Sequence, residues 1–249
     1  MPDWGWPLAL GVLGLLIGSF LATLVVRWPQ GKSVLGGRSM CDGCGQTLKA
    51  WELVPLASAL VARGTCRSCG AAIDARHWQI ELACGTIGAV SGWAMPGPVG
   101  AAGTMFGWLL IALAALDVLE FWLPDALTAT LAIAGLAAGL IAPPDYAERL
   151  IGGAAGFASL WLIARGYRVW RGRDGLGGGD PKLLGAIGLW LGWRMLPFLL
   201  LLASLVGLGV VLAAALRGKP MRATDRLPFG ALMAIAAYPL WLVMVATVP

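Results

Sequence analysis

The sequence contains little charge and a single histidine. Only 12% of its 249 residues are Asp, Glu, Lys or Arg, whereas 59% are hydrophobic, and this composition excludes an ordinary soluble globular protein. Because His77 is the only histidine, a Ser-His-Asp or Cys-His catalytic mechanism is difficult to build. As a lone imidazole beside Trp78, it is better explained as an interfacial residue than as a base or a metal ligand.

Two further features are missing. No Ala-x-Ala site follows the first apolar run, so we interpret that run as a retained anchor and not as a cleaved signal peptide. The glycine-rich stretch at 175–179 is not followed by Gly-Lys-Ser/Thr, and Asp180 would repel a phosphate. The sequence therefore excludes a phosphate-binding loop of the P-loop type.

Long apolar runs dominate the sequence. A helix needs about 20 residues to cross a bilayer. We predict crossings near residues 8–26, 80–95, 99–116, 126–142, 150–163, 183–193, 195–216 and 227–248. The run at 183–193 is too short to span alone, and we expect it to extend toward the glycine-rich stretch. The predicted fold is an all-α polytopic membrane protein with about eight transmembrane helices, seven being the alternative.

The distribution of Lys and Arg predicts the orientation. With the N-terminus outside the cytoplasm, 16 of the 18 basic residues fall on inner segments, and only Arg149 and Arg194 lie outside. The opposite topology would invert that ratio. The net charge of +5 is therefore an orientation signal, with some attraction to anionic membrane lipid, and is not evidence for nucleic-acid binding.

Residues 28–79 form the one polar domain, between a first helix at 1–27 and a bundle at 80–249. They contain Cys41-Asp-Gly-Cys44-Gly and Cys66-Arg-Ser-Cys69-Gly. Four thiolates at this spacing suit a tetrahedral Zn²⁺ ion, and the glycines let backbone N–H groups approach the sulfurs. Two disulfides or free thiols are the alternatives, but a cytosolic loop disfavours disulfides. We predict a small zinc ribbon with a structural metal and a closed ligand shell.

Glu81 lies just inside the second predicted crossing. Ionisable groups within a membrane are costly and usually functional, but a Glu near a helix end can also reach the interface. Both interpretations stay open.

Two aspartates border apolar segments. Asp117 follows the apolar run 107–115, and Asp180 follows Gly177, Gly178 and Gly179. We predict that they meet at the cytoplasmic edge of the bundle. Two carboxyls within hydrogen-bonding reach share a proton, so the charged one can activate water and the protonated one can act as an acid. That chemistry hydrolyses peptides without metal or histidine, although paired carboxylates also relay protons in transporters.

The predicted inner loop at 117–125 contains no Lys or Arg, unlike the other inner loops. Its acidic residues, Glu120 and Asp125 among them, either balance the basic segments nearby or attract a basic ligand from the cytosol.

Several motifs in this order resemble the type IV prepilin peptidase family of intramembrane aspartyl proteases. They are Gly18-Ser19-Phe20-Leu21, the two Cys-x-x-Cys-Gly pairs, Arg76 with Glu81, Asp117 with Pro124-Asp125, Gly177-Gly178-Gly179-Asp180 with Lys182-Leu183, and Pro228-Phe229-Gly230. The resemblance covers nearly the whole chain.

The resemblance implies a bacterial inner-membrane enzyme of type IV pilus or type II secretion systems. It would cleave a short basic leader from prepilins or pseudopilins after a glycine at the cytoplasmic face, with Asp117 and Asp180 catalytic. Gly177, Gly179 and Lys182 would belong to the active-site loop. The leader would be attracted by three acidic residues, Glu120, Asp125 and Asp174. The tetracysteine loop is typical of members that also N-methylate the new N-terminus with S-adenosylmethionine, a reaction in which Glu81 is a candidate residue.

Three positions depart from the family pattern. Ala22 stands where Asn is common, Asp174 replaces a Glu, and His77-Trp78 replaces Tyr-Pro. Because Ala22 lies in the part associated with methyl transfer, a peptidase without that activity is an alternative. The alternative of a different class is a transporter or assembly scaffold in which the two aspartates relay protons and the ribbon docks a partner.

Overall fold

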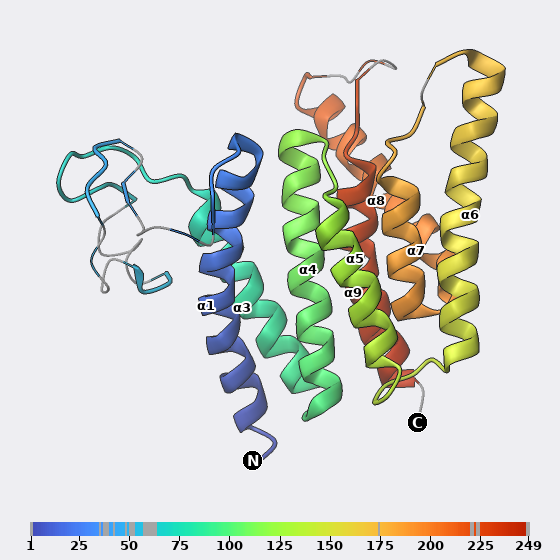
Figure 1. Cartoon of the computed structure of the whole chain (residues 1–249), viewed down its shortest axis with the longest axis horizontal. Helices are drawn as coiled ribbons and strands as arrows, with labels where there is room; N and C mark the ends of the chain where they lie inside the picture. Colours follow the sequence, from blue (N-terminus) through green and yellow to red (C-terminus); the bar gives the residue numbers. More distant parts are fainter. Residues whose placement is uncertain are drawn as a thin grey trace. The chain divides into compact units, whose positions relative to one another are not determined.

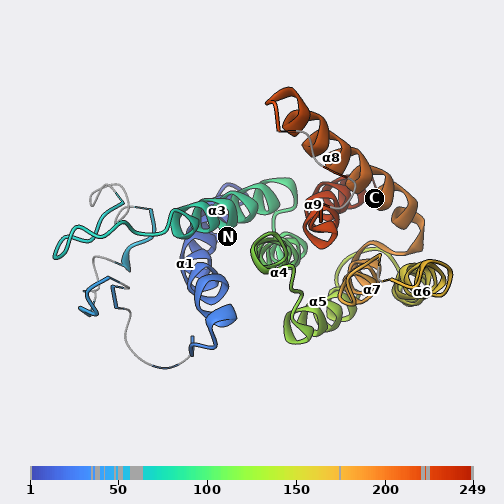
Figure 2. The same ribbon diagram turned by 90° about the horizontal axis from the view of Figure 1, so that it is seen from above.

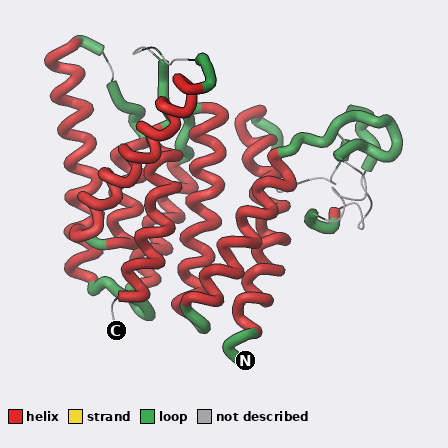
Figure 3. The backbone as a smooth tube through the Cα atoms, turned by 180° about the vertical axis from the view of Figure 1, so that it is seen from behind, coloured by secondary structure: helices red, strands yellow, loops and turns green. Residues whose placement is uncertain are grey.

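The computed structural model describes residues 2–34, 36, 40–41, 43–47, 49, 53–56, 64–173, 175–219, 222 and 225–247. These residues form helices and loops without a β-strand (Figure 3). The elements are α1 (Gly5–Arg27), η1 (Trp28–Gln30), α3 (Arg76–Ala94), α4 (Pro98–Glu120), α5 (Asp125–Ala138), α6 (Tyr146–Arg171), α7 (Asp180–Leu191), η3 (Trp193–Met195), α8 (Leu196–Leu216) and α9 (Phe229–Thr247) (Figure 1). The predicted all-α fold is confirmed.

Every predicted crossing coincides with a helix. Within the described part of the chain, four segments are long and apolar enough to cross a membrane: Gly5–Gln30, Pro98–Glu120, Trp193–Leu216 and Phe229–Thr247. Asp125–Ala138 is apolar but shorter. The chain thus has several apolar helices of the kind found in membrane proteins, while the count of eight crossings stays a prediction.

Helix α6 is longer than the crossing predicted at 150–163. Its N-terminus is capped by Asp145, whose Oδ1 accepts the Glu148 N–H at 2.8 Å. At the other end, Arg and aromatic residues continue the helix until Gly172, which adopts a left-handed conformation with φ of 66° and donates its N–H to the Arg168 carbonyl. The apolar run therefore underestimates this helix, because hydropathy falls before helix propensity does.

The chain divides into two compact units, Met1–Ala112 and Leu113–Pro249. In the first unit, α1 and α3 pack side by side along most of their lengths (Figure 2). Glycines make this approach possible: a Cβ atom on Gly14 would strike the backbone of Cys84, and one on Gly88 would strike the backbone of Leu10. This is the close small-residue packing common in membrane helices. The predicted domains at 1–27, 28–79 and 80–249 stay a prediction.

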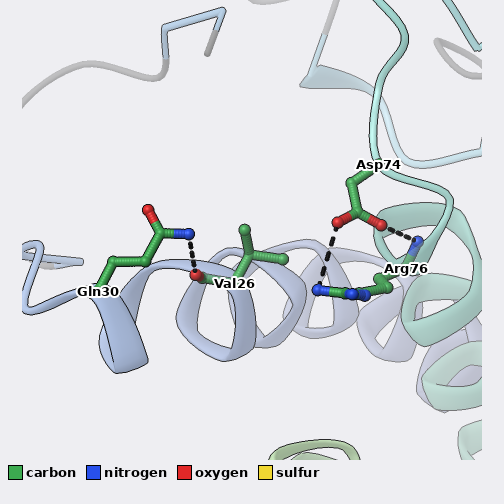
Figure 4. Close-up of polar contacts among 4 residues, drawn as sticks. All are labelled: Val26, Gln30, Asp74 and Arg76. Atoms are coloured by element: carbon green, nitrogen blue, oxygen red, sulfur yellow. Dashed lines mark hydrogen bonds and ion pairs between the residues drawn. The ribbon is translucent and has the colours of Figure 1, made fainter. Parts of the chain in front are cut away.

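Polar contacts mark the adjoining ends of these two helices (Figure 4). Gln30 donates its side-chain amide to the Val26 carbonyl at 3.0 Å, at the end of α1. Asp74 accepts the Arg76 N–H at 2.9 Å and forms an ion pair with the Arg76 guanidinium at 3.5 Å, at the start of α3. A carboxylate is favourable here because the first N–H groups of a helix lack intrahelical partners.

In the second unit, α7 is the most buried helix and contacts α5, α6 and α9. Its contact with α6 again depends on glycine, since a Cβ on Gly188 would strike the carbonyl of Gly152. Against α5, the buried Trp190 indole donates to the Leu131 carbonyl at 2.8 Å. The first residue of α7, Asp180, is therefore held on a helix that is packed on several sides.

Arg149 is fully buried in this unit, at 1% exposure. Its guanidinium donates five hydrogen bonds of 2.7–2.8 Å to the carbonyl oxygens of Gly135, Ala142, Pro143, Pro144 and Leu189. One side chain thus satisfies the last turn of α5, the Pro143-Pro144 turn and the end of α7. The sequence places Arg149 among outer basic residues and gives no sign of this role.

Arg149→Met should lower the stability of the second unit strongly, because it leaves several buried carbonyls without donors. We expect a loss of roughly 3 kcal/mol or more, which corresponds to a fall of roughly 6–12 °C in the unfolding midpoint. Circular dichroism of the detergent-solubilised protein measures it. The control is Arg194→Met, which removes an ion pair of 2.9 Å with Glu148 from a mostly exposed arginine and should cost less than about 1 kcal/mol. Equal midpoints for the two variants would contradict this role of Arg149.

Candidate active site

Asp117 is a buried carboxylate near the end of α4, at 5% exposure. Its Oδ2 accepts the N–H of Ala231 at 2.8 Å, in the first turn of α9. A Cβ on the preceding residue, Gly230, would lie 2.9 Å from the same oxygen, so a larger residue there would crowd the carboxylate. The start of α9 therefore cradles Asp117, at the helix end where backbone N–H groups favour a negative charge.

Asp180 is the first residue of α7 and is also buried, at 6% exposure. Its Oδ2 accepts the N–H of Gly177 at 3.0 Å, and a Cβ on Gly177 would lie 3.1 Å from that oxygen. The glycine-rich loop thus bends back so that its backbone meets the carboxylate. A side chain at position 177 would crowd the Asp180 carboxylate, as one at position 230 would crowd that of Asp117.

Leu123 connects these two carboxylate environments. It is buried in the loop between α4 and α5, and both Gly179 and Gly230 lie against its side chain, so that a Cβ on either would come within 2.9 Å of it. Asp117 and Asp180 interact electrostatically across this region. The structure therefore brings together the two aspartates that the sequence singles out, together with Gly177 and Gly179.

The other acidic residues lie apart from the buried pair. Glu120 and Asp125 are exposed at the end of α4 and the start of α5. Asp125 Oδ1 is 2.6 Å from Lys182 Nζ, so an exposed ion pair links the first turns of α5 and α7. Asp174 lies outside the described residues. Asp125 and Lys182, predicted separately, are thus direct partners.

The four cysteines Cys41, Cys44, Cys66 and Cys69 form one cluster in the first unit, with all four sulfur atoms within 4.8 Å of one another. None of them is in a disulfide. The backbone N–H groups of Cys69 and Ser68 face the Cys66 sulfur and lower the pKa of its thiol to about 6. A group of four thiols with a thiolate-stabilising backbone could hold a metal ion.

The two Cys-x-x-Cys-Gly segments adopt the same turn. The backbone carbonyl of Cys41 accepts the N–H of Gly45 at 2.8 Å, and the backbone carbonyl of Cys66 accepts that of Gly70 at 2.9 Å. Both glycines are left-handed, with φ of 72°. The Cys41 N–H donates to Gln46 and the Cys66 N–H to Ala71, in an equivalent pattern. The glycine after each cysteine pair is therefore needed for backbone geometry.

Glu81 is a buried carboxylate of α3, at 6% exposure. Its Oε2 accepts the N–H of Leu56 at 2.8 Å, and its backbone packs against Gly18 of α1. Ala22, four residues after Gly18, is fully buried. Glu81 therefore is not an interfacial side chain extended toward water in this structure, and it lies in a different compact unit from the aspartate pair.

Two family models match the chain in sequence order. Residues 12–95 match the Bacterial Peptidase A24 N-terminal domain, and residues 104–212 match the Type IV leader peptidase family. The first region contains the cysteine cluster, and the second contains both buried aspartates. The chain belongs to the type IV leader peptidase family.

Curated relatives of this leader peptidase cover most of its length. Three of them are each named Prepilin leader peptidase/N-methyltransferase. The protein from Burkholderia pseudomallei is 39% identical, over 90% of this chain and 81% of the relative. The protein from Pseudomonas aeruginosa is 36% identical, over 91% and 87%. The protein from Dickeya chrysanthemi is 38% identical, over 83% and 82%. No solved structure gives a significant match.

Sequence reasoning missed two parts of the leader peptidase site. The backbone of Gly230 and Ala231 carries no side-chain chemistry, although Pro228-Phe229-Gly230 belongs to the motifs quoted above. Leu123 looks like any apolar residue before Pro124. In both cases the residue contributes to the site through where it lies in the fold and not through a reactive side chain, so its role could not be predicted from residue type alone.

Proposed function

We propose that this chain is an aspartyl endopeptidase of the bacterial inner membrane, which removes the short basic leader of type IV prepilins or pseudopilins after a glycine. The observation that carries the proposal is the pairing of Asp117 with Asp180. Both side chains are buried and they interact electrostatically. Asp180 accepts a hydrogen bond from the N–H of Gly177, and Asp117 accepts one from the N–H of Ala231. Family membership and the names of the relatives support the substrate class.

The pair would work with one shared proton. The charged carboxyl takes a proton from a water molecule placed between the two, and that water attacks the carbonyl carbon of the leader's final glycine. The protonated carboxyl donates to the carbonyl oxygen, and a proton then passes to the leaving amine as the peptide bond breaks. The N–H groups of Ala231 and Gly177 hold one oxygen of each aspartate, which fixes both carboxyl planes before substrate binds.

The orientation proposed is that of the positive-inside pattern, with the N-terminus outside and the aspartates at the cytoplasmic edge. Exposed acidic residues near that edge, Glu120 and Asp125, would attract the basic leader. Asp125 already holds one ammonium group, that of Lys182, at 2.6 Å. Lys182 therefore occupies the position that a leader Lys or Arg would take, and the substrate would displace it. Asp174 is proposed for the same role on sequence alone.

Asp125→Asn should raise the KM for a prepilin with its natural basic leader by roughly fivefold. This factor corresponds to the free energy of about one exposed charge interaction. It should leave the KM unchanged for a prepilin whose leader Lys and Arg are replaced by Gln. Lys182→Gln breaks the same ion pair but frees Asp125, so this control should lower the KM for the basic leader. Initial cleavage rates against substrate concentration measure both effects. A rise in KM for both variants would show that the ion pair matters only for stability.

We propose that the cysteine cluster holds structural zinc. A tetrahedral Zn²⁺ ion with Zn–S bonds of about 2.3 Å separates its sulfur ligands by about 3.8 Å. Cys41 Sγ and Cys69 Sγ are 3.8 Å apart, and all four sulfur atoms lie within 4.8 Å of one another, so the four thiols are close enough to converge on one ion. Four cysteines fill the coordination shell and leave no position for a substrate. The metal would therefore stabilise the fold of the loop and take no part in catalysis.

We further propose that the enzyme N-methylates the new N-terminus. The names of the relatives support this activity. S-adenosylmethionine would supply the methyl group. Glu81 offers a buried carboxylate to a cationic group, and both the sulfonium of that cofactor and the new α-ammonium group are cationic. Ala22, one helical turn after Gly18 in α1, contributes no polar side-chain atom.

One assay tests the whole proposal. Purified enzyme is incubated with a prepilin and S-adenosylmethionine, and the product is analysed by mass spectrometry. The expected product has lost its leader and gained one methyl group. Leader loss without methylation would refute the methyltransferase activity alone. An unprocessed prepilin would refute the peptidase and favour a proton-relaying membrane protein.

A further inference from the structure

The C-terminal half of α6 carries an unusual surface in the second unit. An open hollow of about 560 Å³ lies along one face of the helix and is lined by Leu162, Arg165, Gly166, Val169 and Trp170. We name it the α6 notch. Its floor is Gly166, where an added Cβ would meet no atom within 4 Å. Gly166 adds no side chain to this hollow, which is open on one side.

The side chains around the α6 notch are exposed although several are large and apolar. Val169 and Trp170 are exposed to 79% and 77%, and Leu162 to 60%. In the proposed membrane arrangement α6 is one of the crossings, so its exposed apolar surface faces lipid. Cavity and apolar side chains together therefore indicate a site for a partly apolar molecule.

Charge at one end of the notch identifies the chemistry of that molecule. No Asp or Glu occurs between Arg149 and Arg173, whereas four arginines lie between 165 and 173. Arg165 stands over the Trp161 ring at 5.7 Å, and Arg171 over the Trp170 ring at 4.7 Å. Arginine with tryptophan is typical of the level of lipid head groups, where the indole is amphipathic and the guanidinium binds phosphate. The preceding residues, Trp161 to Ile163, are exposed and apolar.

We propose that the α6 notch binds one anionic phospholipid. Its phosphate contacts Arg165, its glycerol lies over Gly166, and its upper acyl chain runs past Leu162. Arg165 is the one basic residue among those that line the notch, and it lies about 4.5 Å along the helix axis from Leu162. The exposed apolar residues Trp161 to Ile163 precede it, so the helix offers partners to the acyl chain and to the head group in that order. The inference rests on the proposed membrane orientation and not on the peptidase chemistry.

The experiment uses the full-length protein in detergent, titrated with phosphatidylglycerol or with phosphatidylcholine of the same acyl chains. Native mass spectrometry counts the bound lipids and gives their dissociation constants. For the unmodified protein we expect one site with a roughly tenfold preference for phosphatidylglycerol. Gly166→Leu places a bulky side chain in the notch and should weaken phosphatidylglycerol binding at that site roughly tenfold. Arg165→Gln should remove the preference between the two lipids.

Gly209→Leu is the matched control. Gly209 also lies inside an apolar helix, α8, and a Cβ there would meet no atom within 4 Å. This variant makes the same Gly-to-Leu substitution on a different helix from the arginines of the notch. It should bind phosphatidylglycerol as the unmodified protein does. Equal binding by the Gly166→Leu and Gly209→Leu variants would overturn the proposal. Competition by millimolar inorganic phosphate would also overturn it, because the site would then take free phosphate. Leader cleavage, measured on the same samples, reports separately on the proposed function.

Discussion

Asp117→Asn and Asp180→Asn should each reduce leader cleavage by roughly a thousandfold or more, because either change removes one member of the acid–base pair. Asn keeps the shape of Asp and its amide oxygen still accepts a hydrogen bond. The contact of residue 117 with the Ala231 N–H, and that of residue 180 with the Gly177 N–H, can therefore persist. The measurement is the initial rate of leader removal from a purified prepilin, followed by mass spectrometry.

Asp145→Asn is the control for these two variants. Asp145 caps the start of α6, and Asn caps helices about as well as Asp, so this variant should keep its cleavage rate and its stability. Circular dichroism should show the same unfolding midpoint for all three proteins to within a few degrees. Normal processing of the prepilin by both catalytic-pair variants would remove the basis for an aspartyl mechanism, and a proton-relay role would then explain the buried pair better.

Cys41→Ser should abolish stable zinc binding, the second large effect that we expect. A hydroxyl is a much poorer ligand than a thiolate, and the remaining three cysteines leave the tetrahedron open. Metal analysis should give about one zinc per chain before the change and close to none after it. Because the loop is small, loss of the metal should also expose it to trypsin at Arg67, which is already on the surface.

Cys84→Ala provides the comparison for the zinc experiment. Cys84 is fully buried in α3 and belongs to no metal-binding group among the described residues, so its removal should leave zinc content unchanged. Unaltered zinc content and trypsin resistance in the Cys41→Ser protein would show that the cluster is not a metal site. Reduced zinc in both variants would point to general unfolding of the first unit.

The sequence predicts the reactive groups of this protein better than their surroundings. Asp117 and Asp180 stand out because ionised side chains are rare beside apolar runs, and the cysteines stand out by their spacing. Both signals come from residue type and local order. The role of the Ala231 N–H cannot be predicted from the sequence, because every residue except proline has a backbone N–H. Only the fold determines which N–H meets a buried carboxylate.

Arg149 illustrates the opposite error. The positive-inside pattern counts it as one of two exceptions on the outer side, a charge with no further role. In the structure its five donors meet five carbonyls that three separate segments leave without partners. Such a residue is found by accounting for backbone acceptors at helix ends and turns, and that accounting requires coordinates. The Asp125–Lys182 pair is similar, because each residue is predictable alone but their contact is not.

The glycine contact between α6 and α7 limits how the enzyme can admit a substrate. Gly152 and Gly188 leave no room for a side chain between the two backbones, and the ring of Tyr167 of α6 occupies the space that a side chain on Gly175 of the connecting segment would need. These helices can neither slide nor separate by small steps without losing that fit. We therefore expect that any shift of Asp180 on substrate entry moves α6 together with α7.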